Sequence, residues 1–252
     1  MRRIRQLSTA TLLFGVFATV APAIEPASLP SGPSFRLETE IYQNKANEPS
    51  ARHKILFDSG VMYDLQEQGG NVHTVFDPAR GRVILLHTTQ QVQTEISTQH
   101  LIDITAQLKV AAQQHGKSES FGIDAEVKQT GEEYTVAFGN CRYHTTTQPA
   151  PRAELAAAYH ELTIWAARLN ALRRVGTPPF GRLALGHKLA ADGRLPLDMT
   201  LSIDRGVSQQ HYRAHHLLLE QLSELDRRAI AAVGEQLASF QKVSLEAFPS
   251  DD

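Results

Sequence analysis

The sequence predicts an α+β protein in which a strongly curved antiparallel sheet is covered by helices. Segments with a two-residue alternation of apolar and polar side chains occur in the first, middle and last thirds of the chain. Longer stretches between them carry apolar residues at helical spacing. The resulting order is strands, helix, strands, helices, strands, helix, which differs from the regular strand–helix alternation of parallel sheets.

The N-terminus has the features of a secretory signal peptide. Three arginines within the first five residues precede an apolar run, and residues 21–23 fit a small-x-small cleavage site. The run is shorter than the roughly 20 apolar residues of a membrane span. We expect a signal peptide over residues 1–23, a flexible leader over 24–34 and one domain over 35–250. The protein would then be exported to a periplasm or cell envelope, without a transmembrane segment after cleavage.

Charge and cysteine content exclude several classes of partner and site. Cleavage would remove three arginines and no acidic residue, so the formal charge would change from −2 to −5. No basic stripe remains for a phosphate backbone, so nucleic acid is not an expected partner. Cys141 is the only cysteine, which excludes an intrachain disulfide and zinc sites built on cysteine pairs. It is expected to be a small core residue. No cofactor is indicated.

The first third predicts a strand followed by a meander. Residues 35–42 alternate as a strand with one buried face, and residues 52–96 predict four strands with tight connections. The first of these runs over 55–65, with Gly60 as a bulge or bend. A turn at residues 77–81 follows the second strand, since proline and glycine there suit a turn.

The middle of the chain contains the strongest helical patterns. A helix capped by Ser97 or Thr98 should end at Gly116. Strands are predicted over residues 121–127, 134–138 and 141–144. A long helix then carries one broad apolar stripe between Leu155 and Leu172. A shorter helix over 179–191 begins with proline, and the two should form a hairpin that covers the sheet.

The last third returns to strands and closes with a helix. Residues 195–203 and 212–219 are predicted to pair as strands. Ser223 to Asp226 is a capping-box start for a helix, and residues 243–247 are expected to form an edge strand.

One short motif suggests proteolysis. Asp58-Ser59-Gly60 follows an apolar strand and is similar to the active-site turn of aspartic proteases. That chemistry needs two carboxylates that share a proton, and a single-domain protein would obtain the second by dimerising. Val61 stands where serine, threonine or alanine is usual, and no second Asp-Ser/Thr-Gly occurs in the sequence. A bend in the sheet is the favoured interpretation, and a dimeric protease that uses Asp58 is the alternative.

Three histidines are weak candidates for a metal site. His211 and His215 are four residues apart and His216 follows. Positions i and i+4 share a face in a strand or a helix. No carboxylate joins them at recognisable ligand spacing, so a polar sheet face is the favoured interpretation and no metal is predicted.

The layout resembles that of the LolA/LolB-like lipoprotein carriers. A signal-like start precedes about ten antiparallel strands, with an early meander, a helix after it and further helices between later strands. Residues 57–63 and 75–78 are similar to the family's early strands, where a short turn and an aromatic precede a strand that ends in an Asp-Pro-like turn. Over residues 35–250 the resemblance implies an incomplete barrel with three to four helices across its hollow. It also implies a non-catalytic envelope protein that binds a lipid or a lipoprotein acyl chain.

An apolar ligand between sheet and helices would contact inward-facing side chains. The residues expected there are Phe57, Val61, Tyr63, Val83 and Leu85, capped by Trp165 and Leu169. A third possibility is a ligand-free envelope scaffold or interaction protein with a filled interior.

Overall fold

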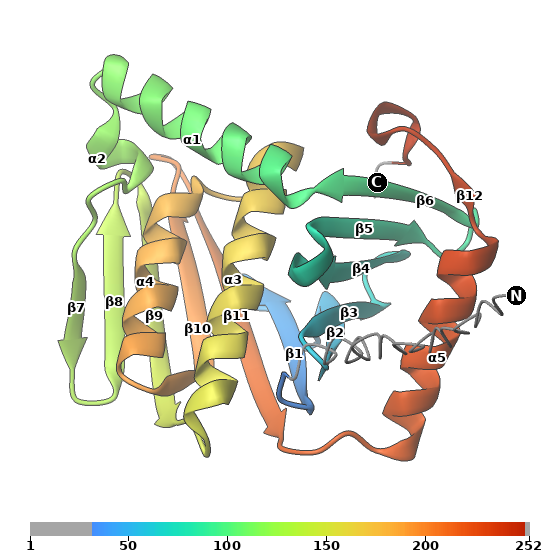
Figure 1. Cartoon of the computed structure of the whole chain (residues 1–252). Helices are drawn as coiled ribbons and strands as arrows, with labels where there is room; N and C mark the ends of the chain where they lie inside the picture. The colour runs from blue at the N-terminus through green and yellow to red at the C-terminus, as the bar shows by residue number, and fades with distance from the viewer. Residues whose placement is uncertain (1–31, 250–252) are drawn as a thin grey trace, which may run out of the picture.

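Twelve strands form one open sheet in the computed structural model, which describes residues 32–249 (Figure 1). The predicted signal peptide and most of the predicted leader therefore lie outside the described residues. Neighbouring strands are antiparallel, except that the short edge strand β12 runs parallel to β6. The two edge strands, β12 and β7, do not pair with each other, so the sheet is not closed.

The strands follow the order β12-β6-β5-β4-β3-β2-β1-β11-β10-β9-β8-β7 across the sheet. Their bounds are β1 Phe35–Gln43, β2 Ala51–Asp58, β3 Val61–Gln68, β4 Val72–Asp77, β5 Arg82–His87, β6 Val92–Ser97, β7 Val127–Thr130, β8 Glu133–Phe138, β9 Cys141–Pro149, β10 Arg194–Asp204, β11 Gln209–Leu219 and β12 Gln241–Lys242. The α-helices are α1 Thr98–Gln114, α2 Ser118–Phe121, α3 Ala153–Arg173, α4 Pro179–Ala191 and α5 Glu224–Ser239, and 3₁₀ turns occupy Pro78–Arg80 and Leu245–Ala247. The predicted α+β class, with an extensive antiparallel sheet and covering helices, is confirmed.

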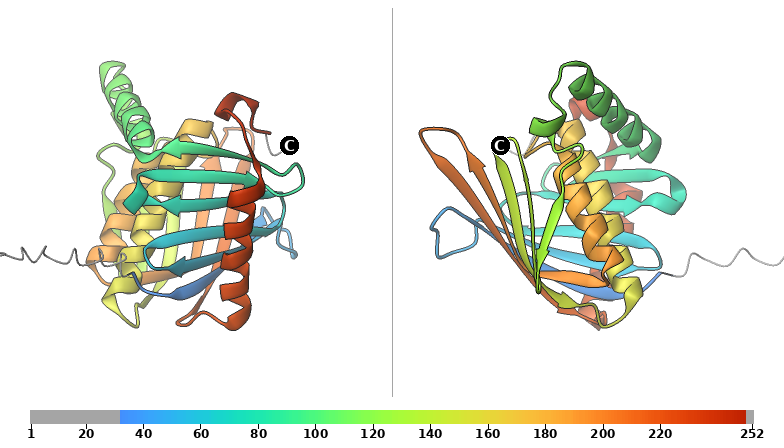
Figure 2. Two further views of the ribbon diagram at one scale, coloured as in Figure 1. Left: turned by 45° about the vertical axis from the view of Figure 1, so that its right-hand side comes forward. Right: turned by 90° about the vertical axis from the view of Figure 1, so that its left-hand side faces the viewer.

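Two helical layers lie on opposite faces of the sheet (Figure 2). The α3–α4 hairpin covers one face, called the inner face here, and α5 covers the outer face of strands β2–β5. Alternation along each strand separates the two sets of side chains: Phe57 packs towards α3, whereas Leu56 packs beneath α5. None of the helices in the described part of the chain is long and apolar enough to cross a membrane.

Local sequence signals set the N-terminal starts of three helices as predicted. The backbone N–H of His100 donates to Ser97 Oγ at the start of α1. Ser223 and Asp226 form the predicted capping box of α5, and α4 begins at Pro179. These signals act within one helical turn, so the sequence alone is enough to place them.

Asp58-Ser59-Gly60-Val61 forms a tight hairpin and not a bend within one strand. Asp58 pairs with Val61, and the two residues between them have φ angles of 52° and 78°. Positive φ at both central positions is the type I′ geometry that matches the twist of a two-stranded ribbon. The predicted strand over 55–65 is therefore two strands, and the meander contains five strands in place of four.

Two further predicted strands were wrong. Residues 121–127 begin as the end of α2 and a turn in which Gly122 has a φ angle of 71°, so pairing starts only at Val127. The closing edge strand is Gln241–Lys242, whereas Leu245–Ala247 forms a 3₁₀ turn capped by Ser244.

Candidate functional site

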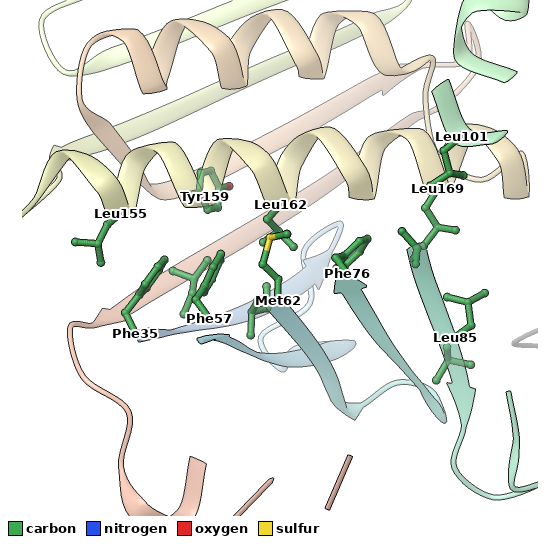
Figure 3. Packing of buried hydrophobic residues seen from close by; sticks show 14 of the residues in the cluster. Phe35, Phe57, Met62, Phe76, Leu85, Leu101, Leu155, Tyr159, Leu162 and Leu169 are labelled. Atoms are coloured by element: carbon green, nitrogen blue, oxygen red, sulfur yellow. The ribbon is translucent and has the colours of Figure 1, made fainter. Parts of the chain in front are cut away.

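Five of the seven expected ligand-binding residues lie in the packed core on the inner face of the sheet. The side chains of Phe57, Val83, Leu85 and Leu169 are each at most 4% exposed, and the partly buried Trp165 packs against them. Figure 3 shows Phe57, Leu85 and Leu169 among the apolar side chains that fill the space between α3 and the sheet. In this structure these residues form a core that holds α3 on strands β1–β5.

Val61 and Tyr63 lie on the other face, so their inward assignment was wrong. Both pack with the apolar side chains beneath α5. The cause is the two-residue hairpin: Phe57 pairs with Met62, so Met62 shares its face, and Tyr63 takes the opposite one. A strand that continued through Gly60 would have kept Phe57, Val61 and Tyr63 together.

An open groove lies further along the inner face, between the α3–α4 hairpin and strands β1, β11 and β10. It has two adjoining lobes that share Ile41, Tyr143 and Asn170. The first, called the polar lobe, has a volume of about 280 Å³; the second, called the apolar lobe, has about 550 Å³. In the right-hand view of Figure 2, β10 and β11 turn away from the helices, so the sheet and the α3–α4 hairpin diverge along the groove.

The lobes differ in chemistry. The polar lobe is lined by Leu37, Thr39, Ile41, His53, Ile55, Asp64, Tyr143, Tyr159, Leu162, Thr163, Ala166, Ala167, Asn170, Arg182 and His216. The apolar lobe is lined by Ile41, Tyr143, Asn170, Gly176, Met199, Leu201, Ile203, Arg205, Gln210, Tyr212 and Ala214. In the second set most of the residues from β10 and β11 are aliphatic or aromatic. Its polar side chains include Asn170, Arg205 and Gln210, and Arg205 donates to Gln210 at 3.0 Å.

A row of polar side chains crosses four strands on the floor of the polar lobe. Thr39 of β1 pairs in register with His53 of β2 on one side and with His216 of β11 on the other. Thr39 Oγ1 lies 2.9 Å from His216 Nδ1, and His53 Nδ1 lies 2.7 Å from Asp64 Oδ1 of β3. Register pairing places Thr39 beside both histidines, whereas Asp64 pairs with Ile55 and contacts His53 diagonally.

The two histidines of this row titrate in opposite directions. His216 is 8% exposed, and its burial, together with Arg182 and His215, lowers its pKa to about 3. For His53, burial acts to lower the pKa, but the hydrogen bond to Asp64 and the charge of that carboxylate outweigh it, so the net pKa is raised. At neutral pH His216 is therefore an uncharged hydrogen-bonding group.

Arg182 of α4 crosses to α3 above this floor. Its Nη2 donates to the hydroxyl oxygen of Tyr159 at 2.9 Å and to Thr163 Oγ1 at 3.2 Å. Thr163 in turn donates to the carbonyl of Tyr159 at 3.1 Å. Arg182 Nη1 is buried and has no hydrogen-bond partner among the described residues. Because buried donors are rarely left unpaired, this guanidinium has capacity for a further acceptor.

The candidate metal histidines do not converge. His216 faces inward, whereas His211 and His215 lie on the outer face, where they bind Ser202 at 3.0 Å and Asp198 at 2.9 Å. Four residues of strand also separate His211 from His215 by about 13 Å, which is too far for one ion. Within residues 32–249 no group of three or more histidine, cysteine, aspartate or glutamate side chains could hold a metal.

Asp58 ends β2 and accepts a hydrogen bond from Ser34 Oγ at 2.6 Å. This hydrogen bond connects the chain just before β1 to the β2–β3 hairpin. Gly32 also packs directly on Gly60: a Cβ added to Gly32 would lie 2.4 Å from the backbone nitrogen of Gly60. Asp58 therefore has a structural role here. The protease alternative stays a prediction, since it depends on a second copy of the chain.

Cys141 is buried among the apolar residues between β8–β10 and α4, as the sequence predicted. Burial raises the pKa of its thiol, which disfavours the reactive thiolate.

No protein-family model matches this chain, and no curated protein matches it. The groove itself is therefore the basis for a functional assignment.

Sequence reasoning missed Thr39, His53, Asp64 and Arg182, and it named His216 only as a weak metal candidate. A signal existed for Thr39, because it occupies an inward position in a strand whose other inward residues are apolar. The remaining members come from different elements: the sheet order β3-β2-β1-β11 brings the strand residues together, and Arg182 reaches them from α4.

Proposed function

We propose that this chain is an exported envelope protein that binds an apolar ligand, a lipid or a lipoprotein acyl chain, without catalysis. The ligand would lie in the groove between the curved sheet and the α3–α4 hairpin. In this proposal the open sheet acts as an incomplete barrel of the LolA/LolB-like type, and the helical hairpin covers its hollow.

The observation that carries the proposal is the groove with its two lobes. Each volume is within or close to the range of about 300–1,000 Å³ that is usual for small-molecule sites. The lining is mostly apolar with a few convergent polar groups, which is the composition of sites that bind amphiphilic molecules. A scaffold protein would be expected to fill such a space with its own side chains, because protein interiors are closely packed.

The test is a substitution that fills the groove. Ala214 faces the apolar lobe from β11, so Ala214→Trp should occupy much of that lobe. We expect wild-type protein to bind N-phenyl-1-naphthylamine with a rise in its fluorescence, and to release it when an acyl-chain ligand is added. Ala214→Trp should reduce dye binding by about tenfold or more.

Ala137→Trp is the matched control. Ala137 lies on β8 at an exposed position between the inward residues Val136 and Phe138, so it points away from α4. This variant should bind the dye as the wild type does. If the wild type binds no dye, and no lipid is found with the purified protein by mass spectrometry, the ligand-free scaffold replaces this proposal.

Export is tested separately. The mature protein recovered from a cell envelope fraction should begin near residue 24, as shown by mass spectrometry of its N-terminal peptide. Recovery of full-length protein in the cytoplasmic fraction alone would contradict this part of the proposal.

A further inference from the structure

The charged groups around the polar lobe define which end of a ligand would enter it. Three ionisable residues besides His216 and the two tyrosines line this lobe: Arg182, His53 and Asp64. Asp64 is already paired with His53 at 2.7 Å, so that its negative charge is offset when the imidazole is protonated. Arg182 has no carboxylate partner among the described residues, and its Nη2 donates to two neutral hydroxyl groups. The lobe therefore contains one positive charge without a counter-ion.

Of the two arginines along the groove, Arg182 is better placed than Arg205 to bind an anion. Arg205, in the apolar lobe, is exposed and bonded to Gln210. Arg182 is half-buried beneath the helical hairpin, and its buried Nη1 is unpaired. A guanidinium that is partly removed from water and has no carboxylate partner binds an anion more strongly than an exposed one, whose charge is screened.

Resting on the proposed function, we propose that the ligand is a single-chain amphiphile with a small acidic head group, a carboxylate or a phosphate monoester. The head group binds Arg182 in the polar lobe, and the acyl or alkyl chain extends into the apolar lobe past Ile41 and Tyr143. The smaller volume of the polar lobe, about 280 Å³, suits a compact head group. The larger lobe, with Met199, Leu201 and Tyr212, accommodates the chain.

His53 and Asn170 complete the polar surroundings. Asn170 is shared by both lobes and so lies where head and chain would meet. The pKa of His53 is raised above its ordinary value of 6.5, so at pH 6.5 its imidazole is more than half protonated and offsets Asp64. The neutral His216 contributes no charge of its own. The positive charge of Arg182 thus dominates the lobe under these conditions.

The experiment compares four ligands that share one chain length. Laurate, dodecyl phosphate, 1-dodecanol and methyl laurate are each used to displace N-phenyl-1-naphthylamine from the mature protein, residues 24–252, at pH 6.5. We expect laurate or dodecyl phosphate to bind about tenfold more tightly than the alcohol and the ester, which corresponds to about 1.4 kcal/mol. Tighter binding of laurate than of dodecyl phosphate would identify the carboxylate head, and the reverse the phosphate.

Two arginine variants locate the head group. Arg182→Gln should bring the acidic ligands to the affinity of dodecanol, while the affinity for dodecanol changes less than twofold. Arg182→Lys, which keeps the charge, should retain most of the preference. Arg205→Gln is the matched control and should leave the preference unchanged.

Several outcomes would overturn this inference. If neither laurate nor dodecyl phosphate binds the wild type more tightly than dodecanol, the acidic head group is rejected, and the groove is left as an apolar site. Loss of the preference in Arg205→Gln and not in Arg182→Gln would place the head group at the other end. Failure of all four ligands to displace the dye, or of the dye to bind, would reject the proposed function as well. The wild-type comparison does not depend on whether Arg182→Gln folds.

Discussion

Lowering the pH from 7 to 5 should destabilise this fold through His216, the buried imidazole on the groove floor. Its pKa is about 3 in the folded protein, because burial disfavours the charged form, against an ordinary value of 6.5. At pH 5 the unfolded chain therefore binds a proton that the folded protein does not. Stability attributable to this residue is present above pH 6.5 and is lost progressively as the pH falls towards 3. Between pH 7 and pH 5 the loss is about 2 kcal/mol, at 1.36 kcal/mol per pKa unit.

Urea unfolding followed by circular dichroism measures this loss. His216→Gln removes the titration but keeps a side chain able to bond to Thr39. The free energy of unfolding of the wild type should fall by about 2 kcal/mol more than that of His216→Gln between the two pH values. His53 has a raised pKa and acts in the opposite direction, but it is present in both proteins and cancels in the difference.

His211→Gln is the control, since His211 lies on the same strand and faces outward. It should show the same pH dependence as the wild type. If His216→Gln loses as much stability as the wild type, the imidazole is not held neutral by burial, and the reasoning about the groove floor is wrong.

Three further substitutions, two of them paired with a comparison variant, test the packing around the sheet by urea or thermal unfolding. Asp226→Asn should cost about 2–3 kcal/mol, because the 2%-exposed carboxylate both caps α5 and pairs with an arginine of β1; the exposed Glu224→Gln should cost less than about 0.5 kcal/mol. Gly181→Ala should destabilise by about 1–3 kcal/mol, because the added Cβ would lie 2.0 Å from an aromatic ring of β8. Gly234→Ala on α5, with nothing within 4 Å, should instead stabilise by up to about 1 kcal/mol, and a destabilised variant would show that the helix is packed differently. Ser59→Asn should stabilise by about 0.5 kcal/mol, since asparagine adopts positive φ more readily; a loss would contradict the type I′ turn.

Local signals explain which elements could be predicted. The Ser97 cap, the Ser223–Asp226 capping box and Pro179 each act over three or four residues, and all three helix starts were predicted correctly. The strand over 55–65 was the main error. Val61, Tyr63 and Leu65 continue the apolar alternation beyond the turn, but they do so on the outer face, which α5 also covers. Only the positive φ of Ser59, a residue that is not glycine, separates the two-residue turn from a continuous strand, and composition does not reveal it.

The groove could not be derived in this way. Thr39, His53 and His216 meet because β1 pairs with β11 across 177 residues of sequence, and no local pattern encodes that pairing. Arg182 reaches them only because α4 folds back on α3.

By itself the sequence determined the α+β class, most helix and strand positions, and the capping of the main helices, since each depends on side chains close together in the chain. It also indicated a secretory N-terminus, which lies outside the described residues. The tertiary structure alone decided which side of each strand faces inward and where a groove remains. It also decided that the expected ligand-binding residues form a packed core or lie beneath α5. Those properties depend on strand register and on the divergence of two layers, and both are set by contacts between distant segments.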